Sequence, residues 1–262
     1  MKIDEIARYN IERWKALARA NALFTRPYLN LDAASARARL DPEGWLGEIA
    51  GKDVLCLAGG GGQQSAAFAL LGANVTVVDL SEEQLQRDRQ VAAHYQVRIE
   101  TLQGDMRDLS RLPAASFDIV WQPYSLNFVP NVLDVFSQVA SVLRHGGVYR
   151  FNCANPFFSG LTEHDWNGEG YLLRRPYQDG AEISYADSAW VYDQSGESVP
   201  QPREYRHILS TCVNGLIERG FVIRHLSDST DFSPDPNATP GTWAHLTAFA
   251  PPWLILLAVY RP

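Results

Sequence analysis

Residues 54–62 read Val-Leu-Cys-Leu-Ala-Gly-Gly-Gly-Gly, an apolar run of strand length that ends in a glycine cluster. A helix-like segment follows at residues 63–71, and a second β-branched run at residues 74–79 ends in an acid. Two apolar runs of this length, separated by a short amphipathic segment, predict a strand–loop–helix–strand unit. The sequence therefore predicts a nucleotide-binding βαβ unit.

The glycine cluster and the acid indicate the kind of ligand. Backbone without Cβ atoms lets a ligand lie directly against the chain, and the N-terminus of the following helix presents unpaired N–H groups. Asp79 ends the second run, 20 residues after Gly59. A carboxylate at that position can accept both hydroxyls of a ribose. The loop and the acid together predict a ligand of the adenosine type.

Spacing within the loop separates the classes of nucleotide-binding protein. The dinucleotide fingerprint Gly-x-Gly-x-x-Gly requires a small sixth residue, but that position is Gln64 in one register and Ser65 in the other. A Gly-x-x-x-x-Gly-Lys-Ser/Thr phosphate loop is absent, because Gly51-Lys52 precedes the strand and continues into an acid. A small-x-Gly-x-Gly loop, Ala58 to Gly62, remains.

This unit resembles motif I and its following acid in the class I, seven-stranded methyltransferases that depend on S-adenosylmethionine (SAM). Gly60 and Gly62 match the last two glycines of that motif. Ala58 stands where the first glycine is usual, and Cys56 where an acid is common. Because alanine is nearly as small as glycine, the loop is expected to close. The missing acid removes one contact expected near the methionyl amino group.

The resemblance implies an α/β fold with a doubly wound, mostly parallel seven-stranded sheet, a C-terminal antiparallel hairpin, an N-terminal helical lid and an inserted β-rich substrate region. We expect one domain, residues 1–262. Its expected parts are N-terminal helices (1–50), a SAM-binding core (51–155), an inserted substrate or lid region (156–202), and a C-terminal helix and strand pair (203–262). The residues that the resemblance assigns to SAM and its product S-adenosylhomocysteine are Ala58, Gly59, Gly60, Gly61, Gly62, Asp79, Leu80, Gly104, Asp105, Met106 and Gln122.

Asp105 follows a third predicted strand, residues 97–102. In the resembled family an acid at this place binds the adenine amino group, and the next residue contacts the ring. A turn residue after Gly104 is the alternative interpretation of Asp105. The order and distance of Asp105 behind Asp79 favour binding.

Composition and charge limit the partners. The chain has 262 residues with 46% hydrophobic content, enough for a full core, and a net charge of −7, which argues against a nucleic-acid surface. Its three cysteines lack Cys-x-x-Cys spacing, and no metal-ligand cluster is found, so we expect no metal. The longest apolar run, Trp253 to Tyr260, is too short to span a bilayer. We expect a soluble, cytoplasmic protein without nucleic-acid or membrane partners. The sequence specifies no oligomeric state.

The acceptor side of the site is expected at three places. Helices predicted within residues 1–50 either pack on the sheet or form a lid that contains Tyr9, Asn10, Trp14 and Tyr28. Gln122-Pro123-Tyr124 follows a fourth strand, residues 117–121, where open α/β sheets place ligands. It partly resembles the Asn/Asp-Pro-Pro-Tyr loop of amino methyltransferases but lacks one proline, so a pocket wall in which Tyr124 contacts substrate is the plainer interpretation.

The third place is the inserted region. Gln178-Asp179-Gly180 indicates a hairpin between Leu172-Leu173 and residues 181–185, and residues 190–192 predict a further strand. Aromatic side chains, including Trp166, suit an organic ligand. His164 is either a base or an exposed loop histidine.

The C-terminal part is expected to close the fold. Pro202 to Arg219 is predicted as a helix, residues 221–224 and 253–260 as the last two strands, and Ser227 to Pro252 as a mobile loop. His207 resembles the histidine of a His-x-Leu segment in related small-molecule enzymes. A structural role for this histidine is the alternative to a role as general base.

These features predict methyl transfer from SAM to a small organic acceptor, at oxygen or nitrogen rather than carbon. Alignment of acceptor, methyl and sulfur supplies most of the rate, so no elaborate catalytic group is required. The candidate catalytic residues are His207, His164 and Tyr124. The candidate substrate-binding residues are Tyr9, Trp14, Tyr28, Tyr124 and Trp166. The alternatives are a non-catalytic protein that binds SAM or S-adenosylhomocysteine, and an NAD(P)-dependent oxidoreductase.

Overall fold

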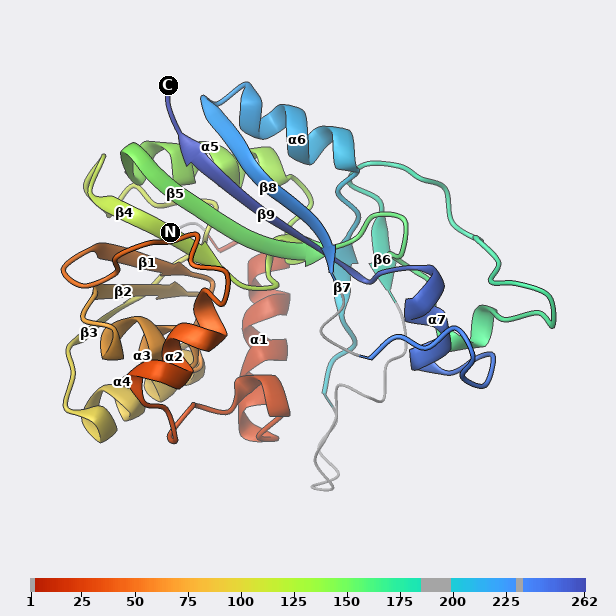
Figure 1. Cartoon of the computed structure of the whole chain (residues 1–262), viewed down its shortest axis with the longest axis horizontal. Coiled ribbons are helices and arrows are strands. Elements are labelled where there is room, and N and C mark those ends of the chain that lie inside the picture. Colours follow the sequence, from red (N-terminus) through yellow and green to blue (C-terminus); the bar gives the residue numbers. More distant parts are fainter. Residues whose placement is uncertain (1–2, 185–198, 230–232) are drawn as a thin grey trace.

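A seven-stranded sheet organises this computed structural model, which describes residues 3–184, 199–229 and 233–262 (Figure 1). Its strand order is β3-β2-β1-β4-β5-β9-β8, with β1 to β5 parallel and β9 antiparallel to both of its neighbours. The strands are β1 (Asp53–Leu57), β2 (Asn74–Asp79), β3 (Ile99–Gln103), β4 (Phe117–Gln122), β5 (Leu143–Ala154), β8 (Phe221–Ser229) and β9 (Trp253–Tyr260). The predicted α/β fold with a C-terminal antiparallel pair is confirmed.

Helices cover both faces of the sheet around β1. Leu55 and Leu57 pack into one apolar cluster with α5, while Val54 and Cys56 pack into another with α2 and α3. A strand covered on both sides is apolar throughout, which is why β1 does not alternate. The helices are α1 (Glu5–Arg19), α2 (Ala33–Leu40), α3 (Gln64–Leu70), α4 (Glu82–Tyr95), α5 (Val132–Val142), α6 (Leu209–Ile217) and α7 (Trp243–Phe249), with 3-10 turns η1 (Leu23–Thr25), η2 (Leu126–Phe128) and η3 (Glu163–Asp165).

The far half of the sheet is covered by helices α5 and α6 on one face, where they pack on β5 and β8. On the opposite face, Leu257 of β9 packs in a cluster with Ala36 and Leu40 of α2, and the Trp45 ring lies 4.0 Å from that of His225 of β8. This face lines part of the cavity described below.

The prediction of a hairpin in the inserted region is wrong. Leu172 and Leu173 are exposed and outside any strand, whereas β6 (Glu182–Ser184) pairs antiparallel with β7 (Arg203–Tyr205). The Arg203 Nε donates a 3.0 Å hydrogen bond to Glu182 Oε1 across this pair. Such a pairing depends on residues far apart along the chain, so the local turn signal did not reveal it. The strand expected at residues 190–192 lies outside the described residues.

The expected helix and loop near the C-terminus also need correction. Residues 203–205 form β7, and α6 begins at Leu209, so the helix predicted from Pro202 is much shorter. Within the expected loop from Ser227 to Pro252, α7 begins after Thr242, whose Oγ1 accepts the His245 N–H at 3.4 Å. This cap is a recognised helix start signal that the proline-rich composition obscured.

Candidate active site

The glycine loop joins β1 to α3 and lies against Asp79. The Gly60 N–H donates to Asp79 Oδ2 at 2.9 Å. A Cβ at Gly60 would lie 2.8 Å from Gln84 Cβ, and one at Gly62, where φ is +70°, would lie 2.7 Å from the Arg87 carbonyl oxygen. Both distances are shorter than real Cβ contacts, so these two positions require glycine. The two glycines therefore allow the loop to pack closely on α4.

Ala58 adopts the conformation that its position demands. Its φ is +46°, in the left-handed region, and its N–H donates to the Val78 carbonyl at 2.7 Å. A residue with a Cβ costs roughly 1–2 kcal/mol there. The loop thus closes as expected for a small residue, at a conformational cost that glycine would avoid.

A buried carboxylate that sequence reasoning missed supports the loop from below. Asp88 of α4 accepts the N–H groups of Gly61 and Gly62 at 3.0 and 3.1 Å, and the Ser65 hydroxyl donates to it as well. Burial and repulsion from Asp79 raise the pKa of Asp88 to about 7 against the hydrogen bonds that lower it. Asp88 lies among the buried residues of α4. An acid at a helix position expected to be buried would have indicated from the sequence that Asp88 has a polar partner.

Asp79 is prepared to accept further hydrogen bonds. It accepts the N–H groups of Gly60 and Ser81 at 2.9 and 2.8 Å. Desolvation raises the pKa of its carboxyl to about 6 in spite of these two bonds. A desolvated carboxylate gains from added donors, and ribose hydroxyls are such donors.

One cavity of about 1400 Å³ contains most of the predicted cofactor residues. Its lining includes Ala58, Gly60, Asp79, Leu80, Gly104, Asp105 and Met106. Gly59, Gly61, Gly62 and Gln122 lie outside the lining. The Gln122 side chain is completely buried, where its Oε1 accepts the Tyr149 hydroxyl at 2.6 Å and its Nε2 donates to Ser125 Oγ at 2.9 Å.

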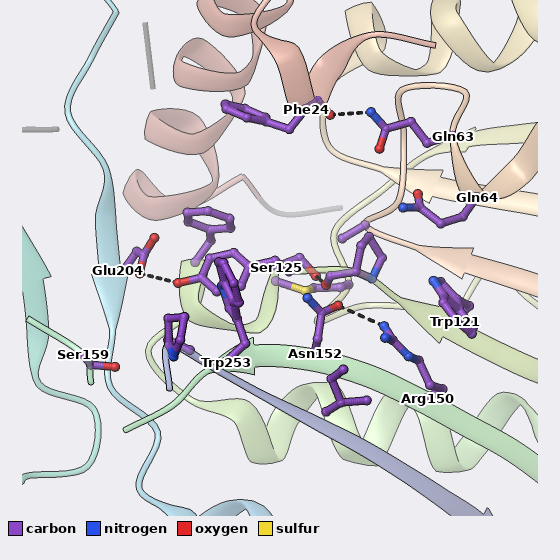
Figure 2. A pocket seen from close by; sticks show the side chains of 18 of the residues that line it. Phe24, Gln63, Gln64, Trp121, Ser125, Arg150, Asn152, Ser159, Glu204 and Trp253 are labelled. Atoms are coloured by element: carbon purple, nitrogen blue, oxygen red, sulfur yellow. Dashed lines mark hydrogen bonds between the residues drawn. The ribbon is translucent and has the colours of Figure 1, made fainter. Parts of the chain in front are cut away.

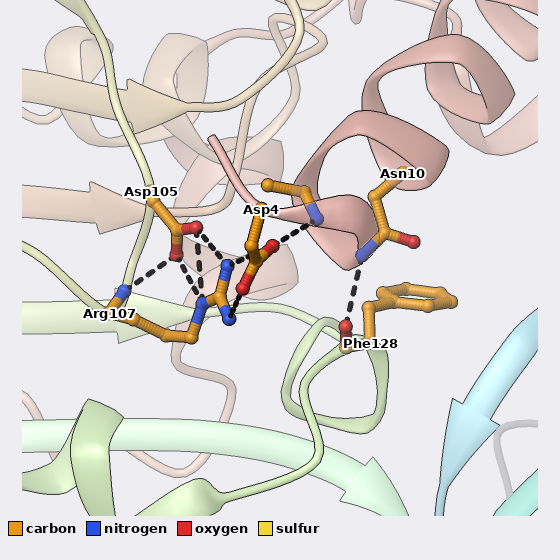
Figure 3. Close-up of polar contacts among 6 residues, drawn as sticks. Asp4, Asn10, Asp105, Arg107 and Phe128 are labelled. Carbon is orange, nitrogen blue, oxygen red and sulfur yellow. Dashed lines mark hydrogen bonds and ion pairs between the residues drawn. The ribbon is translucent and has the colours of Figure 1, made fainter. Parts of the chain in front are cut away.

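Asp105 is joined to the N-terminal helix through an arginine (Figure 3). Arg107 donates from Nη2 to Asp105 Oδ2 at 2.6 Å and from Nη1 to Asp4 Oδ2 at 2.7 Å. Asp4 also caps α1, and its hydrogen bond with Arg107 lowers the pKa of its carboxyl to about 2. Further along α1, the Asn10 Nδ2 donates a hydrogen bond to the Phe128 carbonyl at 3.0 Å. The helix is thereby tied to both sides of the cavity.

Two of the predicted substrate residues line the cavity. Trp14 packs edge-on against Phe128, with ring centroids 5.6 Å apart, and Tyr124 lies beyond the end of β4. The other three make different contacts. The Tyr9 hydroxyl donates to the Gln201 carbonyl at 2.6 Å, Arg39 lies over the Tyr28 ring at 4.5 Å, and Trp166 packs against Tyr171 at 5.2 Å.

Tyr124 meets a carboxylate that the sequence did not indicate (Figure 2). Its hydroxyl donates to Glu204 Oε2 at 2.7 Å, and Glu204 is 5% exposed. Both line the cavity, with Ser125 and Trp253 beside them. Glu204 lies on β7, in a segment predicted as helix, so its direction toward the site was not evident.

The three candidate bases lie in different environments. Tyr124 and His164 line the cavity. His207 does not: its Nε2 donates to the Leu126 carbonyl at 2.9 Å, and burial lowers the pKa of its imidazole. The structure therefore brings Tyr124 and His164 to the cavity and leaves His207 in the packing between β7 and α6.

Comparison with known proteins gives a consistent result. A family model described as a methyltransferase domain matches residues 55–151. The chain is 34% identical over 185 residues to the uncharacterized methyltransferase YbaJ of Bacillus subtilis, an alignment that covers 70% of each chain. It is 29% identical over 154 residues to a ubiquinone biosynthesis O-methyltransferase of Xanthomonas campestris, covering 59% of this chain and 61% of the relative.

Solved structures show the same fold. A SAM-dependent methyltransferase from Mesorhizobium loti is 25% identical with a TM-score of 0.60, covering 88% of this chain and 100% of that one. A putative SAM-dependent methyltransferase from Listeria monocytogenes is 20% identical with a TM-score of 0.62, covering 87% of this chain and 100% of that one.

Fold and glycine loop define a class I, Rossmann-like methyltransferase. The chain belongs to this family of SAM-dependent methyltransferases, as the resemblance predicted. It is an enzyme, and SAM is its cofactor. Neither the non-catalytic alternative nor the oxidoreductase alternative finds support among these relatives. Within the part of the chain that the structure describes, no helix is both long and apolar enough to cross a membrane.

Proposed function

We propose that this enzyme transfers the methyl group of SAM to an oxygen or nitrogen atom of a small organic acceptor bound beside Tyr124 and Glu204. The hydrogen bond between these two side chains, at the wall of the cavity that also contains Asp79, carries the proposal. It supports a proton acceptor in the cavity that the predicted cofactor residues line. The O-methyltransferase relatives, which by their name methylate oxygen, support oxygen as one acceptor atom.

The cofactor end of the cavity fits an adenosyl group. We propose that Asp79 holds the ribose hydroxyls and Asp105 the adenine amino group, beside the bare backbone at Gly60. When bound, SAM supplies a methyl group on a sulfonium, which needs no further activation. The division of the chain into N-terminal helices, SAM-binding core, inserted region and C-terminal strand pair stays a prediction.

Glu204 handles the proton in this proposal. Bound SAM would supply the methyl carbon and would keep the carbon–sulfur electron pair as a neutral thioether, so the methylated acceptor would have one proton to lose. The acceptor then releases one proton. Glu204 takes this proton directly, or Tyr124 takes it while passing its own hydroxyl proton to Glu204. Aromatic walls from Trp14, Phe128 and Trp253 suit a flat organic acceptor.

A methylation assay with labelled SAM tests the proposal against a panel of phenols, catechols and aromatic amines. Once an acceptor is found, Glu204→Gln should lower kcat by about 100-fold or more, the usual effect of losing a general base, with SAM affinity unchanged. Tyr124→Phe should have a smaller effect in the same direction. Glu169→Gln, at an exposed glutamate outside the β6–β7 pair, is the matched control.

Asp79→Ala separates loss of cofactor from loss of acceptor, because it should abolish SAM binding while leaving the Tyr124–Glu204 pair in place. Full turnover of a hydroxyl or amine acceptor by Glu204→Gln would reject the base assignment. A product methylated at carbon would reject the proposed acceptor atom.

A further inference from the structure

Gln84 is a buried amide on the wall of the cavity that contains Asp79. It is 3% exposed and belongs to the first turn of α4, which begins after Ser81. Gln84 lines the cavity together with Gly60 and Asp79. Its side chain offers two N–H donors and one carbonyl acceptor. A polar group this deeply buried is normally hydrogen-bonded within the protein.

The carbonyl oxygen of this amide lacks such a partner. Gln84 Oε1 is buried and accepts no hydrogen bond from any residue that the structure describes. An acceptor that loses its water without gaining a donor destabilises the free protein. A ligand that supplies a hydrogen-bonding group at this place would remove that cost.

The local sequence explains how the amide comes to be unpaired. Residues 81–84 read Ser-Glu-Glu-Gln, a capping-box pattern in which the last side chain accepts the backbone N–H of the first residue. One half of the box is present, because Ser81 Oγ accepts the Gln84 N–H at 3.3 Å. The other half is absent, because the Ser81 N–H donates to Asp79 Oδ1 at 2.8 Å. Asp79 thus replaces Gln84 at the cap and leaves its amide for another partner.

The glycine loop brings Gln84 and Asp79 to the same place. A Cβ at Gly60 would lie 2.8 Å from Gln84 Cβ and 3.0 Å from Asp79 Oδ2. A Cβ at Gly61 would lie 3.7 Å from Gln84 Oε1 and 3.8 Å from its Nε2. Both ends of the amide therefore lie against the loop. The terminal torsion of glutamine is soft and nearly two-fold, so a half-turn exchanges the oxygen and the nitrogen that face a ligand.

We propose that Gln84 hydrogen-bonds a ribose hydroxyl of SAM and recognises the ribose together with Asp79. This assignment rests on the ribose position proposed for Asp79 and adds a neutral partner to it. An ionised carboxylate only accepts hydrogen bonds, whereas an amide both donates and accepts them. Each ribose hydroxyl also donates and accepts, so the pair satisfies more of the diol than Asp79 does alone. Gln84 is thus a specificity-determining residue for the cofactor.

Calorimetric titration of the full chain with S-adenosylhomocysteine and its 2′-deoxy and 3′-deoxy analogues tests this assignment without turnover. Gln84→Met keeps the length of the side chain and removes its polar atoms. It should weaken S-adenosylhomocysteine about three- to tenfold, as expected for one hydrogen bond between uncharged groups. It should weaken one deoxy analogue much less, because that analogue lacks the hydroxyl that the amide binds.

The ligand-free protein should respond in the opposite direction. Because Gln84→Met removes an unpaired buried acceptor, it should raise the thermal midpoint of the ligand-free protein by about 2–5 °C. Gln86→Met makes the same change at an exposed position of α4 and is the matched control. The control should change neither the thermal midpoint nor any of the three affinities.

Three results would overturn the proposal. They are an unchanged affinity for S-adenosylhomocysteine in Gln84→Met, an equal loss for all three ligands, and a lower thermal midpoint. Equal loss would mean that the side chain acts only through packing, and a lower midpoint would mean that its amide has a partner in the free protein.

A second variant serves if Gln84→Met does not fold. Gln84→Glu keeps the shape of the side chain and replaces the amide by a carboxylate. At pH 8 it should weaken S-adenosylhomocysteine about tenfold or more, since a second negative charge then lies beside Asp79 and the N–H donor is gone. Unchanged affinity would overturn the proposal.

Asp79→Ala tests the underlying ribose position separately. If Asp79→Ala abolishes binding of S-adenosylhomocysteine while Gln84→Met leaves it unchanged, the role of Gln84 is rejected and the proposed role of Asp79 stands.

Discussion

Ala58 shows how one residue departs from a family pattern without losing the structure. Its φ of +46° is the conformation that a glycine adopts easily, and its methyl group packs against the cluster that contains Leu55 and Leu57. The methyl contact offsets part of the cost of the left-handed backbone. The alanine is thus a compromise between backbone strain and packing.

Substitution of Ala58 should reveal this balance. We expect Ala58→Gly to raise the free energy of unfolding by only about 0.5 kcal/mol, because relief of strain is offset by lost packing and by a more flexible unfolded chain. Ala58→Val should lower it by about 2 kcal/mol, since a β-branched side chain fits this region poorly. Urea titration of each variant measures both changes.

Ala115, which has a φ of +47° and is exposed, is the control. Ala115→Gly should stabilise by about 1 kcal/mol, because no buried methyl is lost. Equal stability of the Val and Gly variants at position 58 would contradict the proposed strain.

Glu204 and Asp88 make a second point about single residues. Each is a buried carboxylate whose partners come from elsewhere in the chain: Tyr124 for Glu204, and the N–H groups of Gly61 and Gly62 for Asp88. A buried acid is stable only with such partners. Neither acid belongs to a motif, so the pattern of the sequence did not mark them.

Helix α1 is the element that most directly links the surface to the part of the cavity that contains Asp105. Ala7, Asn10 and Trp14 line the cavity, and the cap residue Asp4 bonds to Arg107, which bonds to Asp105. The same aspartate therefore begins the helix and ties it to the proposed adenine site. A weaker ion pair between Asp4 and Arg107 should therefore let α1 move more easily.

The substitution Asp4→Asn removes the ion pair with Arg107 and keeps the N-cap of α1. Asparagine is as good an N-cap as aspartate, so α1 should remain, but the charge that attracts Arg107 is gone. We expect SAM to dissociate about two- to fivefold faster, the effect of losing a partly exposed ion pair. Stopped-flow dissociation of bound SAM measures the rate.

Asp32→Asn is the matched control, because Asp32 caps α2 through the Ser35 N–H and has no ion pair among the described contacts. Its dissociation rate should equal that of the unaltered enzyme. An unchanged rate in Asp4→Asn would show that the ion pair does not hold the helix over the cofactor.

Strand β7 shows what changes when one element differs from its prediction. As a helix, residues 202–219 would have carried His207 near its start as a base. As a strand paired with β6, the segment instead directs Glu204 toward Tyr124, and His207 donates to Leu126. The proposed base thus follows from a strand pairing.

Across the whole molecule, two neighbouring carboxylates under the glycine loop make stability depend on pH. The pKa of Asp79 is raised to about 6 and that of Asp88 to about 7, mainly by desolvation. Both groups have an ordinary value of 3.8. Between these values the folded protein holds protons that the unfolded chain releases. Their contribution to stability is complete below about pH 4 and is lost as the pH rises through about 7.

Comparison of the unaltered protein with Asp88→Asn measures this effect, since other groups cancel in the difference. We expect the stability of the unaltered protein relative to the variant to fall by roughly 2–4 kcal/mol between pH 4.5 and 8. Urea unfolding at three pH values gives the difference.

Asp108→Asn provides the control, because a hydrogen bond from Ser110 lowers the pKa of that exposed carboxyl. Its contribution to stability is already complete above the ordinary pKa, so the difference should be flat over the same range. A flat difference for Asp88→Asn would mean that this carboxylate is not desolvated.

The local sequence determined the parts of this protein that depend on neighbours along the chain. The apolar run before the glycines, the acid after the next strand and the Ser81 cap of α4 each act over a few residues. They carried the resemblance that predicted a mostly parallel seven-stranded sheet with a C-terminal antiparallel pair, the family and the cofactor, all of which are confirmed. Asp79 and Asp105 were predicted as cofactor residues, a prediction that still stands as such, and both line one cavity.

Only the tertiary structure decided the acceptor side. The pairing of β6 with β7, the contact of Tyr124 with Glu204 and the alignment of Trp121, Arg150 and Leu257 join residues from separate elements. Such contacts depend on which strands lie side by side and on which face a side chain emerges. Periodicity within one segment carries neither piece of information, because burial and pairing are properties of the folded chain.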